Sequence, residues 1–221
     1  MWCIPELNRE YIERMEEVLD IYEQPYNPKE PVVCLDEKPI QLHASIRAPI
    51  PATEPGQIAK KDYEYKRCGT ANVFAAVEPK SGTHITIATK NRKGNEFAKF
   101  VYRISRKYTS ANTIHLVMDN LNTHTEKSMF GFYGKRKGKA IWRRFSIHYT
   151  PKHASWLNQA EIEIGIYSSQ CIGKDRISSL SVLKQRTNAW NMRANKDKMK
   201  IDWKFTTQKA RKKFNYTKGK I

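Results

Sequence analysis

The sequence lacks several features that would each have assigned the chain to a class of protein. Its four cysteines are far apart and include no C-x-x-C pair, which argues against a zinc knuckle and against a disulfide scaffold. Reduced thiols in a cytosol-like compartment are therefore expected. No apolar run reaches the roughly 18 residues that a membrane span needs. The N-terminus is acidic and amphipathic and lacks the basic start and apolar centre of a signal peptide.

Acidic residues are also scarce in proportion to basic ones. The chain of 221 residues has 40 Lys and Arg against 22 Asp and Glu, a formal net charge of +18. Solubility alone asks for a net charge of roughly 2–8. So basic a surface predicts a polyanionic partner, with nucleic acid first, because contacts with phosphate release counterions. The alternative is a basic surface that is simply solvated.

The hydrophobic pattern predicts one α/β domain in which helices pack against a mixed sheet. Three prolines in residues 25–31 separate a first helix from the rest, so we expect a helical linker or remnant over 1–30 and the main domain over 31–221, ending in a basic tail. Residues 46–65 and the basic run 133–144 are expected to be loops. The predicted strands are 32–36, 68–79, 83–90, 113–119 and 145–151, and the predicted helices are 8–23, 94–108, 155–171 and 180–194.

Two of the predicted strands end on an aspartate. "VVCLD" ends at Asp36 and "IHLVMD" ends at Asp119. Ligands of α/β sheets gather outside strand ends, and two carboxylates that converge there repel each other unless a cation lies between them. Carboxylate oxygens are suitable ligands for Mg²⁺.

A third acid would allow a second ion to bind. Glu161 shares a helix face with Leu157 and Ile164, so it is expected on a core-facing stripe, whereas Glu163 is expected to point elsewhere. Two metal ions roughly 3.5–4 Å apart stabilise both the attacking and the leaving oxygen of a phosphoryl displacement.

Each acid also has a simpler interpretation. Asp36 could merely end a strand, Asp119 could cap a turn, and Glu161 could be a solvated helix residue. Other functional hypotheses also stay open: a general RNase H-like nuclease, or a truncated DNA-binding remnant without activity. A phosphatase-like role for Asp36 is excluded, because no second acid follows two residues later.

Three motifs, "VVCLDEKP", "VMDNLNTH" and "IHYTPKHASWLNQAEIEIG", resemble the acidic motifs of the DDE transposases of the IS630/Tc1-mariner group. The resemblance covers roughly residues 30–215. It implies an RNase H-like fold and a catalytic and metal-binding triad of Asp36, Asp119 and Glu161. It also implies two Mg²⁺ ions, with Mn²⁺ as a substitute, and cleavage and strand transfer of DNA during insertion-sequence transposition.

The resemblance further implies a homodimer on DNA, with element ends and target DNA as partners, in the cytoplasm of a prokaryote near the nucleoid. Members of the group carry helix-turn-helix domains ahead of the catalytic domain, but residues 1–30 have room for one helix only. The expectation is therefore a catalytic fragment, a truncated product or one piece of a split reading frame.

Residues around the acids form a second set of candidates. Asn120 is expected to position the Asp119 carboxylate by hydrogen bonding. His124 is expected to assist next to Asp119 by orienting water or contacting phosphate, with a surface turn histidine as the alternative. Glu37 is left out of the triad because successive strand residues point to opposite faces. DNA contacts are predicted for basic residues in the run 133–144 and just before the third acid, namely Lys135, Arg136, Lys137, Arg143, Arg144, Lys152 and His153.

Overall fold

A five-stranded mixed sheet is the centre of the computed structural model, which describes residues 7–60, 62–173 and 175–217. The strand order is β3-β2-β1-β4-β5. β1 pairs antiparallel with β2 and parallel with β4, and β4 pairs parallel with β5. The predicted mixed sheet flanked by helices is confirmed. The strands are β1 (Val32–Ser45), β2 (Tyr65–Glu78), β3 (Thr83–Thr89), β4 (Ile114–Met118) and β5 (Phe145–Tyr149).

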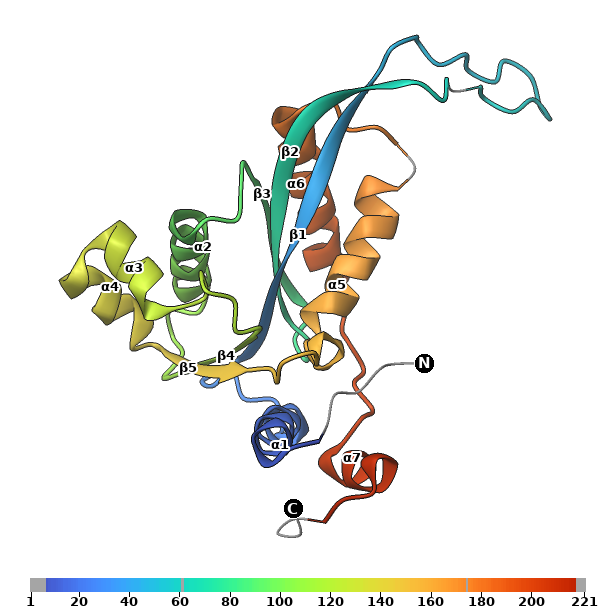
Figure 1. The fold of residues 1–221 in the computed structure, drawn as a ribbon. Coiled ribbons are helices and arrows are strands. Elements are labelled where there is room, and N and C mark those ends of the chain that lie inside the picture. The colour runs from blue at the N-terminus through green and yellow to red at the C-terminus, as the bar shows by residue number, and fades with distance from the viewer. Residues whose placement is uncertain (1–6, 61, 174, 218–221) are drawn as a thin grey trace.

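β1 and β2 are much longer than the other strands. Their far ends leave the body of the molecule and carry a projecting loop (Figure 1). This loop corresponds to the predicted surface segment, and an isolated bridge between Ile50 and Lys60 is its one regular pairing among the described residues. The segment after Asp36, whose course the sequence left open, continues β1 in the same direction.

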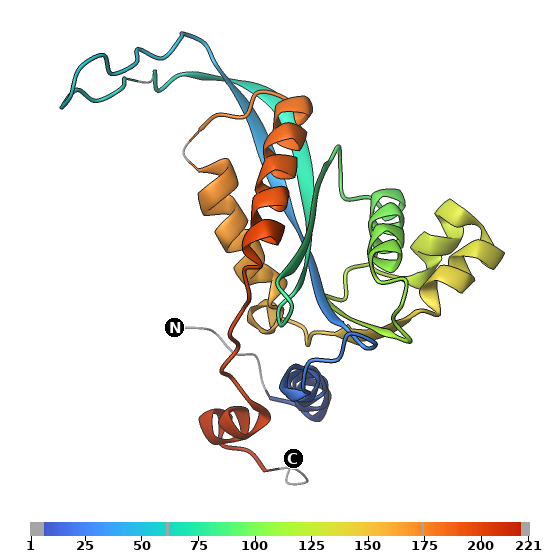
Figure 2. The ribbon, with the colours of Figure 1, turned by 180° about the vertical axis from the view of Figure 1, so that it is seen from behind.

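Helices cover both faces of the sheet, as Figures 1 and 2 show from opposite sides. On one face lie α2 (Gly94–Lys107), α3 (Glu126–Tyr133) and α4 (Lys135–Trp142). On the other lie α5 (Ala160–Tyr167), extended by a wider turn over Ser168–Ile172, and α6 (Leu180–Asp197). Strand alternation explains the two cores, because Leu35 packs with the α2 side whereas Cys34 packs on the opposite side.

The first and last helices lie together at one end of the molecule (Figure 1). α1 (Arg9–Glu23) and α7 (Thr207–Phe214) share a hydrophobic cluster with β1, β4 and the segment before α5. Arg211 of α7 binds both carboxylate oxygens of Glu16 in α1, at 2.7 and 2.8 Å. α1 thus packs directly on the main domain, and the boundary near residue 30 stays a prediction.

Besides α3, which directly precedes the basic run, two further helices lie where the sequence predicted none. The basic run 133–144 was expected to be a loop, but most of it forms α4, so that expectation is wrong. Its glycines suggested a loop, yet a side chain at Gly138 would come within 2.8 Å of the Met129 carbonyl oxygen. Gly138 therefore allows α4 to approach α3 closely. The second of these further helices, α7, lies in the basic tail.

No helix in the described part of the chain is both long and apolar enough to cross a membrane. Cys34, Cys68 and Cys171 are free thiols, and Cys3 lies outside the described residues.

A chain of polar contacts joins α1 to the sheet and predicts a dependence of stability on pH. His115 Nδ1 lies 3.0 Å from His148 Nε2, and His148 Nδ1 lies 2.6 Å from Glu17 Oε1. Burial and the charge of His148 lower the pKa of His115, against a smaller opposing effect of Glu30. Below about pH 6.5 the unfolded chain therefore binds a proton at His115 more readily than the folded chain does, so acid destabilises the fold.

We expect thermal unfolding curves to show a smaller loss of stability between pH 7 and pH 5 for His115→Gln than for the wild type. The difference between the two proteins isolates His115 from the other groups that titrate in this range. An equal loss in both proteins would show that His115 does not contribute.

Candidate functional site

The register of the sheet brings the two aspartates to the same level. Cys34 of β1 lies opposite Val117 of β4, so Asp36 and Asp119 follow these partners by two residues each. Neighbouring strands are about 4.8 Å apart. Asp36 lies in the continuous part of β1, and Asp119 directly follows the end of β4. The two acids therefore lie side by side on neighbouring strands, but the prediction that a strand ends at Asp36 is wrong, because β1 continues to Ser45.

α5 brings Glu161 to the same place. Asn158, which is buried, donates from its side-chain nitrogen to the Leu35 carbonyl oxygen at 2.8 Å, and its Oδ1 accepts from the Ala160 N–H at 3.1 Å. This connects β1, one residue before Asp36, to the start of α5. Glu161 lies in the first turn of α5, and its charge acts on Asp36. Nothing in the local sequence singles out Asn158, because its role depends on this contact.

The expected orientation of the two glutamates of α5 is wrong. Glu161 is exposed and does not lie on a core-facing stripe, whereas Glu163 is fully buried. The prediction counted the helix from Leu157, but Leu157 belongs to a separate 3₁₀ turn (Ser155–Leu157), and α5 begins only at Ala160. Glu163 pairs with His84 at 2.7 Å on the inner side of the helix. Glu161 is left on the exposed side of the helix, where its charge acts on Asp36.

The electrostatic environment of Asp36 is unfavourable for a negative charge. Burial and the charges of Glu161, Glu37 and Asp119 raise the pKa of Asp36 to about 7, although the Glu37 N–H donates to its carboxylate at 2.8 Å. A carboxylate destabilised in this way is stabilised by a cation.

Asp119 has the opposite environment, because His124 lies against it. His124 Nδ1 is 2.6 Å from Asp119 Oδ1, and its Nε2 is 3.1 Å from Glu37 Oε2. Burial lowers the pKa of His124, but these two carboxylates outweigh it and raise the pKa to about 9. Burial likewise raises the pKa of Asp119, yet His124 turns the net shift downward. The imidazole also stacks on Phe97, with ring centroids 4.6 Å apart.

A groove of about 840 Å³ opens beside Asp119. Two of the predicted DNA-contacting residues, Lys152 and His153, line it together with Asn120. His153 has a backbone φ of 62°, a sparsely populated conformation for a residue other than glycine. Arg14 of α1 lines the same groove and was not a candidate from the sequence.

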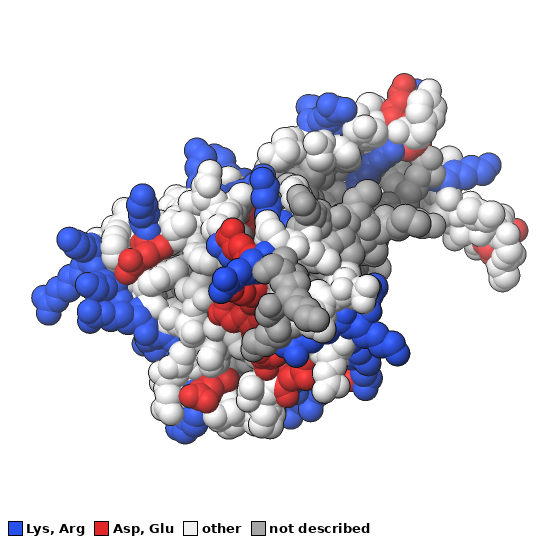
Figure 3. Space-filling view, turned by 60° about the horizontal axis from the view of Figure 1, so that its bottom comes forward, with Lys and Arg blue, Asp and Glu red and all other residues white. Residues whose placement is uncertain are grey.

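The other predicted DNA-contacting residues lie elsewhere. They belong to α4 and the segment after it, where basic side chains gather at one end of the molecule (Figure 3). Lys137 lies over the rings of Tyr102 and Tyr133. Arg144 is occupied, because its guanidinium donates to the Ser105 and Tyr108 carbonyl oxygens near the end of α2. Lys135, Arg136 and Arg143 are exposed.

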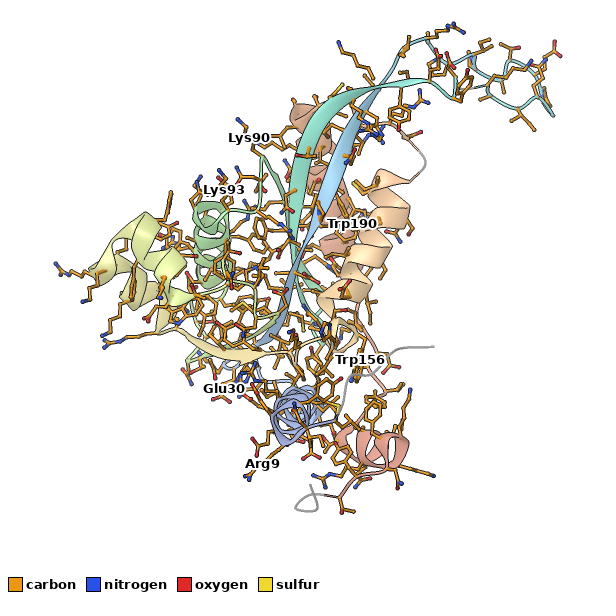
Figure 4. The ribbon with its side chains drawn as sticks, viewed as in Figure 1. Arg9, Glu30, Lys90, Lys93, Trp156 and Trp190 are labelled. Carbon is orange, nitrogen blue, oxygen red and sulfur yellow. The ribbon has the colours of Figure 1, made fainter. Side chains whose placement is uncertain are left out.

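A second basic segment near the acids was missed from the sequence. The loop between β3 and α2 carries Lys90, Arg92 and Lys93, and Figure 4 shows Lys90 and Lys93 projecting from it. Arg92 lies 3.6 Å from Glu37 Oε1 and helps to lower the pKa of Asp119. Trp156, just before the third acid, packs against Phe205 and Phe214.

The charges of Asp119 and Glu161 thus both act on Asp36 in β1. Across the described ranges, no three His, Cys, Asp or Glu side chains lie close enough together to hold a metal ion. The three carboxylates are therefore too far apart in this structure to bind one metal ion together. Such a set of oxygen donors, with one acid destabilised by its neighbours, fits a hard divalent cation.

Known structures share this fold. The Mos1 mariner paired-end complex with Mn has 16% sequence identity and a TM-score of 0.54, over 87% of this chain and 58% of that chain. The mariner Mos1 paired-end complex with Mg has 18% identity and a TM-score of 0.55, over 90% of this chain and 59% of that chain. The Mos1 strand transfer complex has 16% identity and a TM-score of 0.55, over 87% and 57%.

At these identities the similarity establishes the fold, which is RNase H-like and matches the Mos1 catalytic domain. The chain spans less than three fifths of the length of these Mos1 chains. Among curated proteins, no sequence matches significantly. Residues 31–184, well over half of the chain, match the family described as DDE superfamily endonuclease. The chain therefore belongs to the DDE superfamily endonucleases.

Proposed function

We propose that this chain is the catalytic domain of an IS630-like DDE transposase, which cleaves DNA and transfers the cleaved strand during insertion-sequence transposition. The observation that carries the proposal is that Asp36 and Asp119 lie on neighbouring strands of an RNase H-like sheet and that the charges of Asp119 and Glu161 both act on Asp36. Solved Mos1 complexes with transposon ends have the same fold and support the proposal.

Asp36, Asp119 and Glu161 would hold two Mg²⁺ ions, or Mn²⁺ in their place. Two of the Mos1 structures contain Mn or Mg. When bound, the metal supplies activation of a water or a 3′-hydroxyl and stabilises the charge on the DNA phosphate. His124 and Asn120 support Asp119 in this arrangement.

The basic residues would bind the phosphate backbone on the two sides of the acids. Lys152, His153 and Arg14 line the groove on one side, and Arg92 lies by Glu37 and Asp119 on the other. Lys135, Arg136, Lys137 and Arg143 would add contacts farther out. We propose element ends and target DNA as partners, a homodimer on DNA, and the prokaryotic cytoplasm near the nucleoid as the location.

Replacing single acids tests this proposal. Asp119→Ala and Glu161→Ala should each abolish Mg²⁺-dependent nicking of supercoiled plasmid DNA, a loss of at least about a hundredfold, because each removes an oxygen ligand. DNA affinity in a gel-shift assay should stay within about twofold, since neither residue is basic. Equal nicking by the wild type and both variants would sink the proposal.

A second substrate distinguishes the remaining alternatives. An oligonucleotide with a free 3′-hydroxyl should become joined to the plasmid if the chain performs strand transfer. Nicking without joining would favour a general RNase H-like nuclease. Salt-sensitive binding without either reaction would favour an inactive DNA-binding remnant.

A further inference from the structure

Glu37 is a charged side chain next to Asp36 that points to the face of β1 opposite to that of Asp36. It precedes Lys38 and directly follows Asp36, so strand alternation turns it toward α2 and away from α5. Its side chain is only 4% exposed. A buried carboxylate is unfavourable unless it is paired, so its partners should explain its presence.

Its inner partner is His124. Glu37 Oε2 lies 3.1 Å from His124 Nε2, while the other ring nitrogen, Nδ1, lies 2.6 Å from Asp119 Oδ1. One imidazole thus lies between two carboxylates, that of Glu37 in β1 and that of Asp119 directly after β4. His124 Nδ1 also lies 3.2 Å from the Asp119 carbonyl oxygen, so the ring is held against both the side chain and the backbone of Asp119.

The imidazole cannot easily turn away. Its side chain is 1% exposed and stacks on Phe97, with an angle of 25° between the two rings. The backbone of the loop is fixed too, because the Tyr149 hydroxyl donates to the His124 carbonyl oxygen at 2.7 Å. Asp119 in contrast is 46% exposed, so the ion pair orients its carboxylate without covering it.

We propose that Glu37 is a positioning residue of this site, which holds the His124 imidazole and through it fixes the Asp119 carboxylate for binding a divalent cation. The proposal rests on the proposed function of the three acids. Arg92 closes the arrangement at the surface, 3.6 Å from Glu37 Oε1, and is 56% exposed. The four side chains therefore form a row from the surface through the interior to the groove beside Asp119, in the order Arg92, Glu37, His124 and Asp119.

The test measures Mn²⁺ binding to the full chain without DNA, by electron paramagnetic resonance of the unbound ion. Glu37→Leu should weaken Mn²⁺ binding by about 10- to 100-fold, the usual effect of removing a group behind a metal ligand. Glu37→Gln keeps an oxygen that can accept from His124 and should recover a large part of that loss. Glu78→Gln is the matched control, because Glu78 is a buried glutamate at the last residue of β2, where its carboxylate accepts from the Ser81 hydroxyl at 2.6 Å, and it should leave Mn²⁺ binding unchanged.

A double-mutant cycle shows whether Glu37 acts through His124. In a His124→Phe background, Glu37→Leu should have little additional effect on Mn²⁺ binding, because the imidazole that transmits it is gone. An undiminished effect in that background would overturn the proposal, and so would unchanged Mn²⁺ binding in Glu37→Leu. If Glu37→Leu does not fold, His124→Phe alone decides the question, because unchanged Mn²⁺ binding in that variant would overturn the proposal.

Failure of the proposed function gives a different result. If Asp119→Ala binds Mn²⁺ as tightly as the wild type, the acids are not the metal site and the proposed function itself is wrong. If Asp119→Ala loses Mn²⁺ binding but Glu37→Leu does not, only the positioning role of Glu37 is wrong.

Discussion

Replacing Asp36 with asparagine is expected to stabilise the metal-free protein and at the same time to abolish DNA cleavage. The pKa of Asp36 is about 7 in the folded protein against an ordinary value of 3.8. Because the folded-state pKa is the higher one, ionised Asp36 destabilises the fold, increasingly above pH 3.8 and fully above pH 7. A shift of this size corresponds to about 2–4 kcal/mol at pH 8.

Differential scanning calorimetry at several pH values checks this expectation. At pH 8 without metal, Asp36→Asn should unfold roughly 5–10 °C above the wild type, and the advantage should disappear toward pH 4. Mg²⁺ should raise the unfolding temperature of the wild type but not of the variant. A variant that is less stable than the wild type at pH 8 would contradict the unfavourable environment of Asp36.

Asp119→Asn provides the matched comparison within the same site. The contact with His124 lowers the pKa of Asp119, so ionised Asp119 stabilises the fold, and this stability is lost as the pH falls through its folded pKa. The same chemical change at the neighbouring strand should therefore destabilise the protein at pH 8. Both variants should lose cleavage.

The second large effect is expected at Glu163, two residues after the third acid. Glu163 and His84 are both buried and lie 2.7 Å apart, and His84 Nε2 donates to the Met199 carbonyl oxygen at 2.9 Å. Removing one partner of a buried pair leaves the other without compensation, which costs about 3–5 kcal/mol. Glu163→Ala should therefore lower the free energy of unfolding by that amount, as urea unfolding would measure.

Glu161→Ala is the control for Glu163→Ala, because the two glutamates belong to the same helix and differ in burial. Glu161 is exposed, so its removal should change the free energy of unfolding by less than about 0.5 kcal/mol. It should nevertheless abolish nicking, whereas Glu163→Ala should retain nicking at a temperature where it remains folded. The reverse pattern would assign the third acid to Glu163.

The strands and the first two acids could be predicted from local sequence. Apolar runs that end on Asp36 and Asp119 determine both the strand and the position of the carboxylate, and the hairpin of β2 and β3 follows from alternation around a turn. The helix α2 could also be predicted, because its apolar residues recur at helical spacing.

The remaining parts of the site depend on contacts between segments that are distant in the sequence. Where α5 begins determines which of its two glutamates is exposed and which is buried. Asn158 sets that start by binding β1. Glu37 gains its partner only when the loop after β4 brings His124 beneath β1. Arg144 carries the charge of a DNA contact, yet it holds the end of α2 instead.

The spacing of the acids along the chain also determines when the site can exist during synthesis. β1, β2 and β3 are consecutive and can pair as soon as they are made, whereas β4 joins β1 only after the intervening helix. Residue 161 follows residue 36 by 125 positions. At a synthesis rate of about 5–20 residues per second, the third acid is added roughly 6–25 s after the first. A nascent chain on the ribosome therefore carries no complete acidic triad until most of the domain has been translated.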